Sequence, residues 1–213
     1  MEDNLVVALV NSAVSDNSET KWMDGVNKLL LAYEMDKEKN IDYLYFAASG
    51  AINAQEYDKA LEFYLLLKEI NYTGIKDEFF ITNIETGLEE KVTETEYKIY
   101  QSSKEYANPR IGQTESRYPE IVKNIALIYV RKGDDDLAIE AINEARSIQP
   151  DDLYLLLNEA DLYIRLSNNA EDDNLRSQYR QKFKEIMKLA VEKDPENGIL
   201  YYNLGIISSE QGE

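Results

Sequence analysis

The segment from Pro119 to Asp152 constrains the fold most strongly, because two helical patterns follow each other across a single turn. In the first pattern, apolar or small residues recur at i, i+3, i+4 and i+7, the spacing of one helical face: Val122, Ile125, Ala126 and Tyr129. Gly133 then predicts a turn, because glycine adopts backbone angles that other residues avoid. The second pattern ends at Pro150, which cannot continue a helix, and contains Ala138, Ile142 and Ala145. These 34 residues therefore predict a helix-turn-helix unit.

The same template fits other stretches of the chain. Residues 41–74 follow it, although Gln55 takes the place of the turn glycine and Tyr72 that of the closing proline. The unit from Leu153 runs to Asn197 and is longer by about eleven residues than the ~34-residue period, and we expect the extra residues in the polar stretch Ser167–Gln178. The predicted divisions are a degenerate helical pair at 1–40, units at 41–74, 119–152 and 153–197, an insertion at 75–118, and a half unit at 198–213.

These features resemble the tetratricopeptide repeat (TPR) family, whose units place small residues where Ala126, Ala138 and Ala145 stand. The resemblance implies an all-α fold, an α-solenoid of stacked helix pairs, in which these alanines and Ala160 are buried at helix crossings. It also implies that the first helix of each unit lines a concave surface. We expect the helix pairs at 4–35, 41–74, 119–152 and 153–197, followed by a lone helix from about residue 198.

The repeat pattern fails between Ile75 and Tyr118. Residues 78–83 are rich in β-branched and aromatic side chains, a turn signal follows at 85–87, and residues 90–93 alternate. This pattern predicts one short β-hairpin. We expect a helix over Thr95–Tyr106 and a loop over 108–112, because Pro109 disfavours helix in the residue before it. The insertion is either a spacer between repeat blocks or a functional element of its own.

Composition narrows the classes of partner. The chain has 41 acidic and 23 basic residues, for a net charge of −18. Such a surface repels phosphate backbones and anionic lipid, so we expect neither nucleic-acid binding nor membrane insertion. No stretch has the length of a spanning helix, and the acidic start lacks the basic region of a signal peptide. The compartment stays open between the cytoplasm and, if a signal peptide has been removed, the bacterial periplasm.

The sequence does not predict an enzyme. It has no histidine and no cysteine, which removes the usual general bases, thiolate nucleophiles and zinc ligands, so we expect no cofactor and no metal. Tyr64 and Lys68 have the Tyr-x-x-x-Lys spacing of short-chain dehydrogenases, but no glycine-rich phosphate loop precedes them. The run Asp134–Asp136 lacks the spacing of a calcium loop, and we interpret it as a cap for the helix from Leu137.

The resemblance places the candidate binding residues on the inner face of successive first helices. They are Lys123, Asn124 and Arg131 in one unit, Tyr154, Asn158 and Arg165 in the next, and Tyr202 and Asn203 in the last. Asparagine stands at the same repeat position three times, and an amide both donates and accepts hydrogen bonds. This row resembles the asparagine ladder of the O-GlcNAc transferase superhelix, and we expect its members to be exposed on one side of the array.

A second resemblance is to the TPR clamp that holds a C-terminal carboxylate. Lys123 and Asn158 match it, but Leu127, Ile199 and Asn203 stand where the other polar or cationic residues are needed. Without cations on the third helix, the carboxylate would lose its charge-assisted hydrogen bonds. The clamp is therefore disfavoured.

Two functional hypotheses remain. The first is a scaffold without enzymatic activity that binds an extended peptide or protein segment on its concave surface, with a net neutral or basic partner. The second is a purely structural or self-associating array. The apparent end of the chain within a repeat unit suggests a fragment, and we expect an apolar flank at Leu200, Leu204 and Ile207 to make contacts, homodimerisation included.

Overall fold

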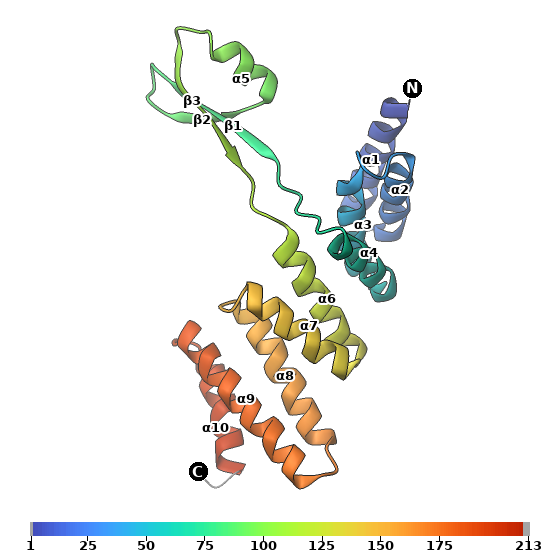
Figure 1. Cartoon of the computed structure of the whole chain (residues 1–213), viewed down its shortest axis with the longest axis vertical. Coiled ribbons are helices and arrows are strands. Elements are labelled where there is room, and N and C mark those ends of the chain that lie inside the picture. Colours follow the sequence, from blue (N-terminus) through green and yellow to red (C-terminus); the bar gives the residue numbers. More distant parts are fainter. Residues whose placement is uncertain (1, 211–213) are drawn as a thin grey trace. The chain divides into compact units, whose positions relative to one another are not determined.

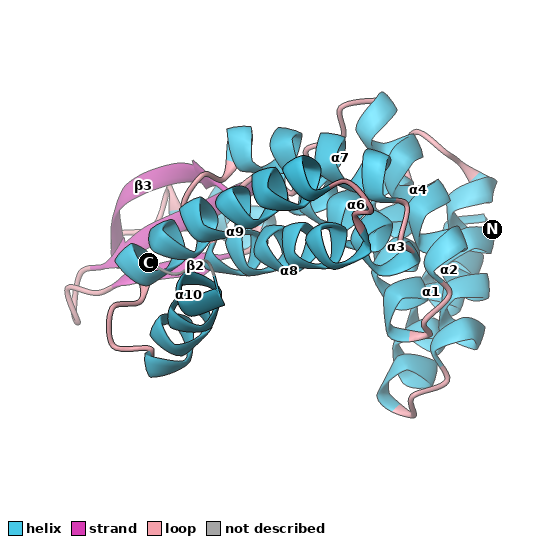
Figure 2. Ribbon diagram, turned by 90° about the horizontal axis from the view of Figure 1, so that it is seen from below, coloured by secondary structure: helices cyan, strands magenta, loops and turns pink. Residues whose placement is uncertain are grey.

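The computed structural model describes residues 2–210, and it divides the chain into two compact units. One unit is helical and consists of the residues before Asn71 and after Tyr118. Residues 71–118 form the other. Figure 1 shows helices following one another as antiparallel pairs, and Figure 2 shows that the strands belong to the second unit. The helices of the first unit are α1 Glu2–Ser18, α2 Trp22–Met35, α3 Ile41–Asn53, α4 Tyr57–Glu69, α6 Tyr118–Lys132, α7 Asp135–Ile148, α8 Leu153–Asn169, α9 Asp173–Lys193 and α10 Gly198–Glu210.

Small side chains allow these helices to pack closely. Ala126 and Ala138 are completely buried, and Ala145 and Ala160 are 1% exposed. This confirms the sequence prediction that all four are buried. Around them lie fully buried large residues, including Tyr64 on α4 and Leu156 on α8. Because interiors are packed to the density of organic crystals, such positions have no room for an added methylene.

The turns between helices need left-handed backbone. Gly133, between α6 and α7, has φ +77°, which costs glycine little. Gln55 has φ +61° in the equivalent turn between α3 and α4, and Thr20 has φ +60° between α1 and α2. Non-glycine residues in this region cost about 1–3 kcal/mol each. The template therefore persists without its glycine because helix packing on both sides outweighs local strain.

The extra residues of the unit from Leu153 lie in longer helices and not in a long loop near residue 170. Helices α8 and α9 have 17 and 21 residues, whereas α7 has 14. A short connection joins α8 and α9, and the Asp172 side chain accepts a hydrogen bond from the Leu175 amide at 2.7 Å. The N-cap at Asp172 shows how an acidic sequence starts a helix, because its carboxylate satisfies an amide that lacks an intrahelical partner. The extra residues lengthen the helix pair.

The second unit contains three strands, one more than the predicted hairpin. Strand β1 (Asp77–Asn83) lies between β2 (Glu89–Val92) and β3 (Tyr106–Gln113), and both pairings are antiparallel. The predicted loop at 108–112 is therefore wrong. The register shifts between Phe80 and Thr82, opposite the part of β3 that contains Pro109, and Asn108 has φ +50°. Proline is tolerated there because a bulge on an edge strand needs no amide donor.

A short helix and several aromatic rings complete this unit. Helix α5 spans Glu94–Tyr100, which corrects the expected helix over 95–106, and Thr93 and Glu96 form a capping box at its start. Ile81 is fully buried, and the Phe79 and Tyr97 rings lie 5.1 Å apart. Tyr106 belongs to β3, where its ring stacks on Tyr100 at 4.2 Å. The aromatic pairs give this small sheet a core of its own.

The C-terminal helix does not expose the predicted flank. Leu200 is 3% exposed and Leu204 is partly buried, because both pack on a cluster that includes Phe183 and Met187 of α9. The Ile207 side chain lies outside the described residues. Among the α10 side chains that the structure describes, the exposed apolar ones are instead Ile199, Tyr201 and Tyr202. The expected exposure was wrong because Leu200 and Leu204 pack on the preceding pair rather than on a following helix.

Candidate functional site

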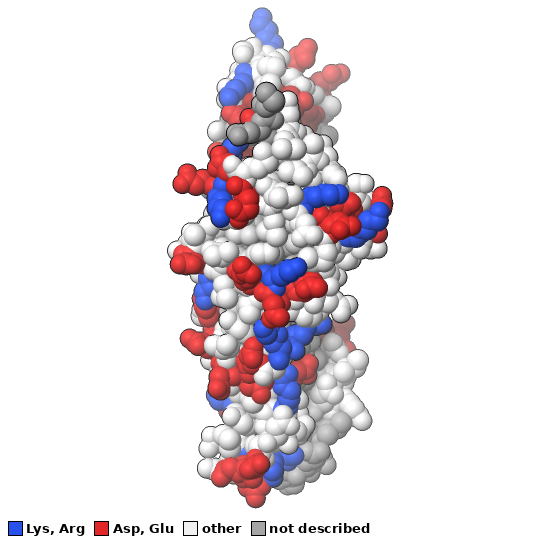
Figure 3. Space-filling view, turned by 90° about the vertical axis from the view of Figure 1, so that its right-hand side faces the viewer, with Lys and Arg blue, Asp and Glu red and all other residues white. Residues whose placement is uncertain are grey.

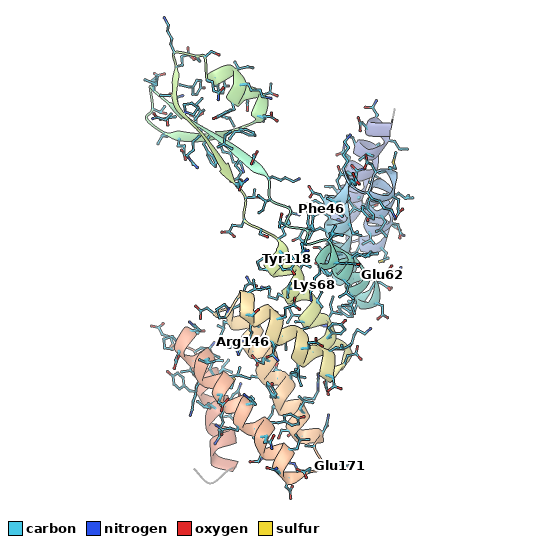
Figure 4. All side chains as sticks on the ribbon, in the orientation of Figure 1. Phe46, Glu62, Lys68, Tyr118, Arg146 and Glu171 are labelled. Carbon is cyan, nitrogen blue, oxygen red and sulfur yellow. The ribbon has the colours of Figure 1, made fainter. Side chains whose placement is uncertain are left out.

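Helix α6 is fastened to α3 and α4 by polar contacts between residues far apart in sequence. The Tyr45 hydroxyl donates to Glu120 at 2.6 Å, and the Asn124 amide nitrogen donates to the Tyr64 hydroxyl at 3.1 Å. Lys68, labelled in Figure 4, reaches from α4 to Glu144 of α7 at 2.5 Å. These contacts join the helices before the 71–118 unit to those after it.

Tyr64 is the buried centre of this junction. Its hydroxyl lies 3.1 Å from the Ser49 hydroxyl as well as from Asn124. Burial raises the pKa of Tyr64 to about 12, because the phenolate would lose its hydration. The Tyr64 hydroxyl is therefore a neutral hydrogen-bonding group, and Lys68 is paired with Glu144.

A pocket of about 210 Å³ opens beside this junction. It receives side chains from α3, α4, α6 and α8, so it spans successive repeat units. Its lining residues are Ile52, Tyr57, Asn124, Leu127, Ile128, Arg131 and Tyr154. Three of the predicted binding residues, Asn124, Arg131 and Tyr154, thus come together around one hollow. The pocket combines an apolar interior with an amide and a guanidinium, as ligand sites commonly do.

Arg131 is held on the pocket wall by an aromatic residue. Its Nη1 donates to the Tyr57 hydroxyl at 2.8 Å, and its guanidinium carbon lies 5.0 Å from the centre of the Tyr57 ring. Tyr57 was not among the predicted binding residues, because only first helices were expected to line the binding surface and Tyr57 begins α4, 74 residues before Arg131. An aromatic residue directly after the turn at Gln55 was the only local signal.

The other predicted cations are paired within the chain. Lys123 donates to Asp152 at 2.9 Å. Burial alone would raise the pKa of Asp152, but hydrogen bonds from Lys123 and the Leu155 amide outweigh it and lower that pKa. Arg165 bonds Asp135 of α7 and the Val130 carbonyl of α6, the latter at 3.1 Å. Both residues therefore brace neighbouring helices.

The acidic run at 134–136 also acts between helices. Asp134 is the N-cap residue of α7, but its side chain makes no capping hydrogen bond. The predicted capping role is therefore wrong for Asp134. Asp135 instead pairs with Arg165 of the following unit. On the face drawn in Figure 3, acidic and basic side chains are interspersed among uncharged ones.

The three predicted asparagines differ in their surroundings. Asn124 is half-buried and donates to Tyr64. Asn158 is half-buried and donates to the Tyr154 carbonyl in its own helix at 2.8 Å. Asn203 is exposed on α10 beside Tyr202, which is 69% exposed. Of the three, only Asn203 is exposed as expected, since Asn124 donates to a neighbouring helix and Asn158 donates to its own helix.

Two other hollows lie among the described residues of the helical unit. One, of about 270 Å³, lies between α1, α2 and α3 and is lined by residues including Val14, Asn53 and Phe46, which Figure 4 labels. The other, of about 580 Å³, lies where Tyr163 and Tyr179 meet Ile139 and Lys182. Its place beside the first turns of the lengthened α9 explains why the repeat template did not predict it.

Two further properties concern only the described part of the chain. Among residues 2–210, no group of three or more metal-ligating side chains is placed to hold an ion. Within the same range, no helix has the length and apolar character that a membrane crossing requires.

No protein-family model matches this sequence, and no curated protein matches it. Solved structures do match. A MamA RS-1 structure, an ArsTM double mutant, has a TM-score of 0.62 at 12% identity, over 98% of this chain and 86% of that one. YrrB, described as a TPR protein with an unusual peptide-binding site, has a TM-score of 0.52 at 13% identity, over 96% and 76%. A TPR protein from Parabacteroides merdae has a TM-score of 0.52 at 13% identity, over 98% and 74%. The chain therefore has the fold of TPR proteins, an array of stacked helix pairs that a small antiparallel sheet interrupts.

Proposed function

We propose that this protein is a scaffold without enzymatic activity that binds an extended peptide or protein segment in the pocket between α3, α4, α6 and α8. The observation that carries the proposal is the meeting of Asn124, Arg131 and Tyr154 around one apolar hollow. Tyr154 is 57% exposed, so it offers contact area to a partner at little conformational cost. Lys123, Asn158, Arg165, Tyr202 and Asn203 continue the same surface in the proposal.

The size of the pocket favours a side chain of a larger partner over a separate small ligand. Sites for drug-sized molecules have volumes of about 300–1,000 Å³, and this pocket has about 210 Å³. A peptide-binding TPR protein of similar fold supports this choice by analogy, since YrrB is described as having a peptide-binding site. We propose no nucleic-acid partner, because the net charge of −18 opposes one.

The experiment selects 12-residue peptides from a displayed library against the whole chain and measures their affinities by calorimetry. Tyr154→Ala removes one pocket wall and is expected to weaken the selected peptides by about tenfold, the scale of one lost interface anchor. Tyr201→Ala is the matched control, because Tyr201 on α10 is 49% exposed and does not line the pocket. Failure to enrich any peptide, or equal binding to wild type and Tyr154→Ala, contradicts the proposal.

The alternative is a structural array that associates with itself through α10. Its specific support is the exposure of Ile199, Tyr201 and Tyr202 on that helix, at 70%, 49% and 69%. Light scattering over a range of protein concentrations distinguishes the two. A dimer that Tyr202→Glu dissociates, together with an empty peptide selection, favours the alternative.

A further inference from the structure

We propose that the bound segment is anchored by an apolar side chain next to a single carboxylate, the apolar group in the 210 Å³ pocket and the carboxylate on Arg131. This inference rests on the proposed function and adds the chemistry of the partner. It concerns a carboxylate in either of two forms, an Asp or Glu side chain or a free C-terminus, and the test separates them.

The first observation is that Arg131 forms no ion pair with any described carboxylate. The chain has 41 acidic residues, and Arg110, Arg146, Arg165 and Arg176 each form an ion pair with one of them. Arg131 is exposed, and its contacts among the described residues are with the Tyr57 hydroxyl and ring. Since no described carboxylate pairs with Arg131 in so acidic a chain, its guanidinium is available to a carboxylate from a partner.

The second observation is that Arg131 is already positioned. Tyr57 accepts one of its five N–H groups and supports its planar face. The remaining donors keep the fork geometry that matches a carboxylate with two hydrogen bonds. Because Tyr57 already restrains this long side chain, less rotamer entropy remains to be lost when the anion binds.

The third observation is the apolar interior beside that guanidinium. Ile128 is 3% exposed, and Leu127 and Ile52 are half-buried, so these side chains form an apolar lining. The volume suits one large aliphatic or aromatic side chain, whose burial removes apolar surface from water. Since Arg131 lines the same pocket, a residue adjacent to that apolar side chain brings its carboxylate to the guanidinium.

The neighbouring charges limit the segment to one anion at this place. Lys123 and Arg165 are already paired with Asp152 and Asp135. The net charge of −18 repels a partner that is acidic over its length. The segment is therefore neutral or basic apart from one carboxylate beside its apolar anchor. This differs from a two-cation clamp, because Arg131 acts alone with Tyr57 as its support.

The test uses acetylated, amidated nonapeptides in a Ser/Lys/Gly background with a central Leu-Glu, Leu-Gln or Ala-Glu pair. The Leu-Glu peptide is expected to bind about tenfold more tightly than the Leu-Gln peptide, the scale of a charge-assisted bidentate pair. Bulk attraction to this acidic protein favours the more basic Leu-Gln peptide, so the opposite preference isolates Arg131. The Ala-Glu peptide is expected to bind weakly, because the pocket stays unfilled.

Variants of the whole chain complete a double-mutant cycle. Arg131→Gln is expected to reduce the ratio of the Leu-Glu and Leu-Gln affinities to less than about twofold, because the charge pair that distinguishes the two peptides is lost. Tyr57→Phe keeps the ring but removes the hydroxyl, and gives an intermediate preference. Arg176→Gln is the matched control, because that arginine lies on α9 and pairs with Asp173. Circular dichroism verifies that each variant is folded.

The outcomes separate this inference from the proposed function. Equal affinity for the Leu-Glu and Leu-Gln peptides, or a preference that Arg131→Gln leaves intact, overturns the carboxylate anchor. If the library peptides still bind more weakly to Tyr154→Ala, the proposed function stands without the carboxylate anchor. A peptide ending in Leu with a free C-terminus, compared with its amide, tests the second source of the carboxylate. Preference for that free acid over the internal Leu-Glu pair would assign Arg131 to chain ends.

Discussion

At the scale of single residues, Tyr64 shows how a polar group stabilises the junction between repeat units. Its ring is fully buried, and its hydroxyl meets Ser49 of α3 and Asn124 of α6. A buried hydroxyl without a partner would cost about 1–3 kcal/mol. Asn124 therefore stabilises the array through Tyr64 and at the same time borders the pocket.

Tyr64 gives the protein a specific response to alkaline pH. Burial raises its folded-state pKa to about 12, against an ordinary value of 10.0 in the unfolded chain. Below pH 10 Tyr64 is protonated in both the folded and the unfolded state, so its full contribution to the free energy of unfolding is present. Above pH 10 the unfolded state ionises first, so the free energy of unfolding falls until the pH passes about 12, by up to roughly 2–3 kcal/mol at ~1.4 kcal/mol per pKa unit.

The measurement compares urea midpoints of wild type and Tyr64→Phe from pH 8 to pH 12. The variant loses its hydroxyl contacts at every pH, so that cost is already present at pH 8. Its midpoint is expected to fall less steeply above pH 10 than that of wild type. Parallel curves for the two proteins would show that Tyr64 keeps its ordinary titration when folded.

The resemblance to TPR units predicted which side chains lie near one another better than it predicted their hydrogen-bond partners. It placed Asn124, Arg131 and Tyr154 on first helices facing one side, and the structure brings these three around one pocket. Tyr57 could not be predicted, because its contact with Arg131 spans 74 residues and the 71–118 unit. The pairing of Lys123 with Asp152 was equally hidden, since a side chain's choice among many carboxylates depends on packing.

At the scale of elements, a partly buried ion pair joins α7 to α8. Arg146, labelled in Figure 4, donates to Glu159 at 2.7 Å, and the two side chains are 23% and 8% exposed. Removing one member of a buried pair leaves the other charge uncompensated, which costs about 3–5 kcal/mol. Replacing both members with apolar residues avoids that cost.

Arg146 is 23% exposed and keeps part of its hydration, so Glu159→Gln is expected to lower the free energy of unfolding by about 1–3 kcal/mol, and Arg146→Met/Glu159→Leu to recover most of the loss. Lys37→Met is the control, because Lys37 and Glu34 are both 58% exposed and such pairs contribute about 0–1 kcal/mol. Urea unfolding followed by circular dichroism measures all three. A double variant no more stable than Glu159→Gln would mean that the charges themselves hold α7 to α8.

Helices and strands could be predicted where the local sequence pattern alone determines the secondary structure. Helical periodicity predicted the helix pairs, because each helix shows its buried face within its own sequence. The lengthening of α8 and α9 was not predicted, since a polar acidic stretch can extend a helix as well as form a loop. Strand β3 was missed because Asn108 and Pro109 signal a loop locally, and only pairing with β1 makes the segment a strand.

At the scale of the whole molecule, net charge opposes folding. The chain carries −18 at neutral pH, and compaction brings those charges together. Ion pairs such as Lys123 with Asp152 offset part of this repulsion. With 41 acidic against 23 basic residues, many carboxylates have no cation to meet. We therefore expect added salt to weaken the repulsion among the carboxylates more than it weakens the attraction within the ion pairs.

Raising NaCl from about 10 mM to about 150 mM shortens the screening length from ~30 Å to ~8 Å, so the urea midpoint at pH 7 is expected to rise. A triple variant tests whether the acidic excess causes this rise: Glu38→Gln, Glu62→Gln and Glu171→Gln. All three glutamates are exposed, and none forms an ion pair among the described residues. The triple variant carries three fewer negative charges and should be more stable at low salt and less responsive to added salt. Exposed ion pairs weaken as salt is added. If the urea midpoint falls when NaCl is raised from about 10 mM to about 150 mM, attraction between paired charges dominates. In that case the acidic excess is spread too widely to destabilise the fold.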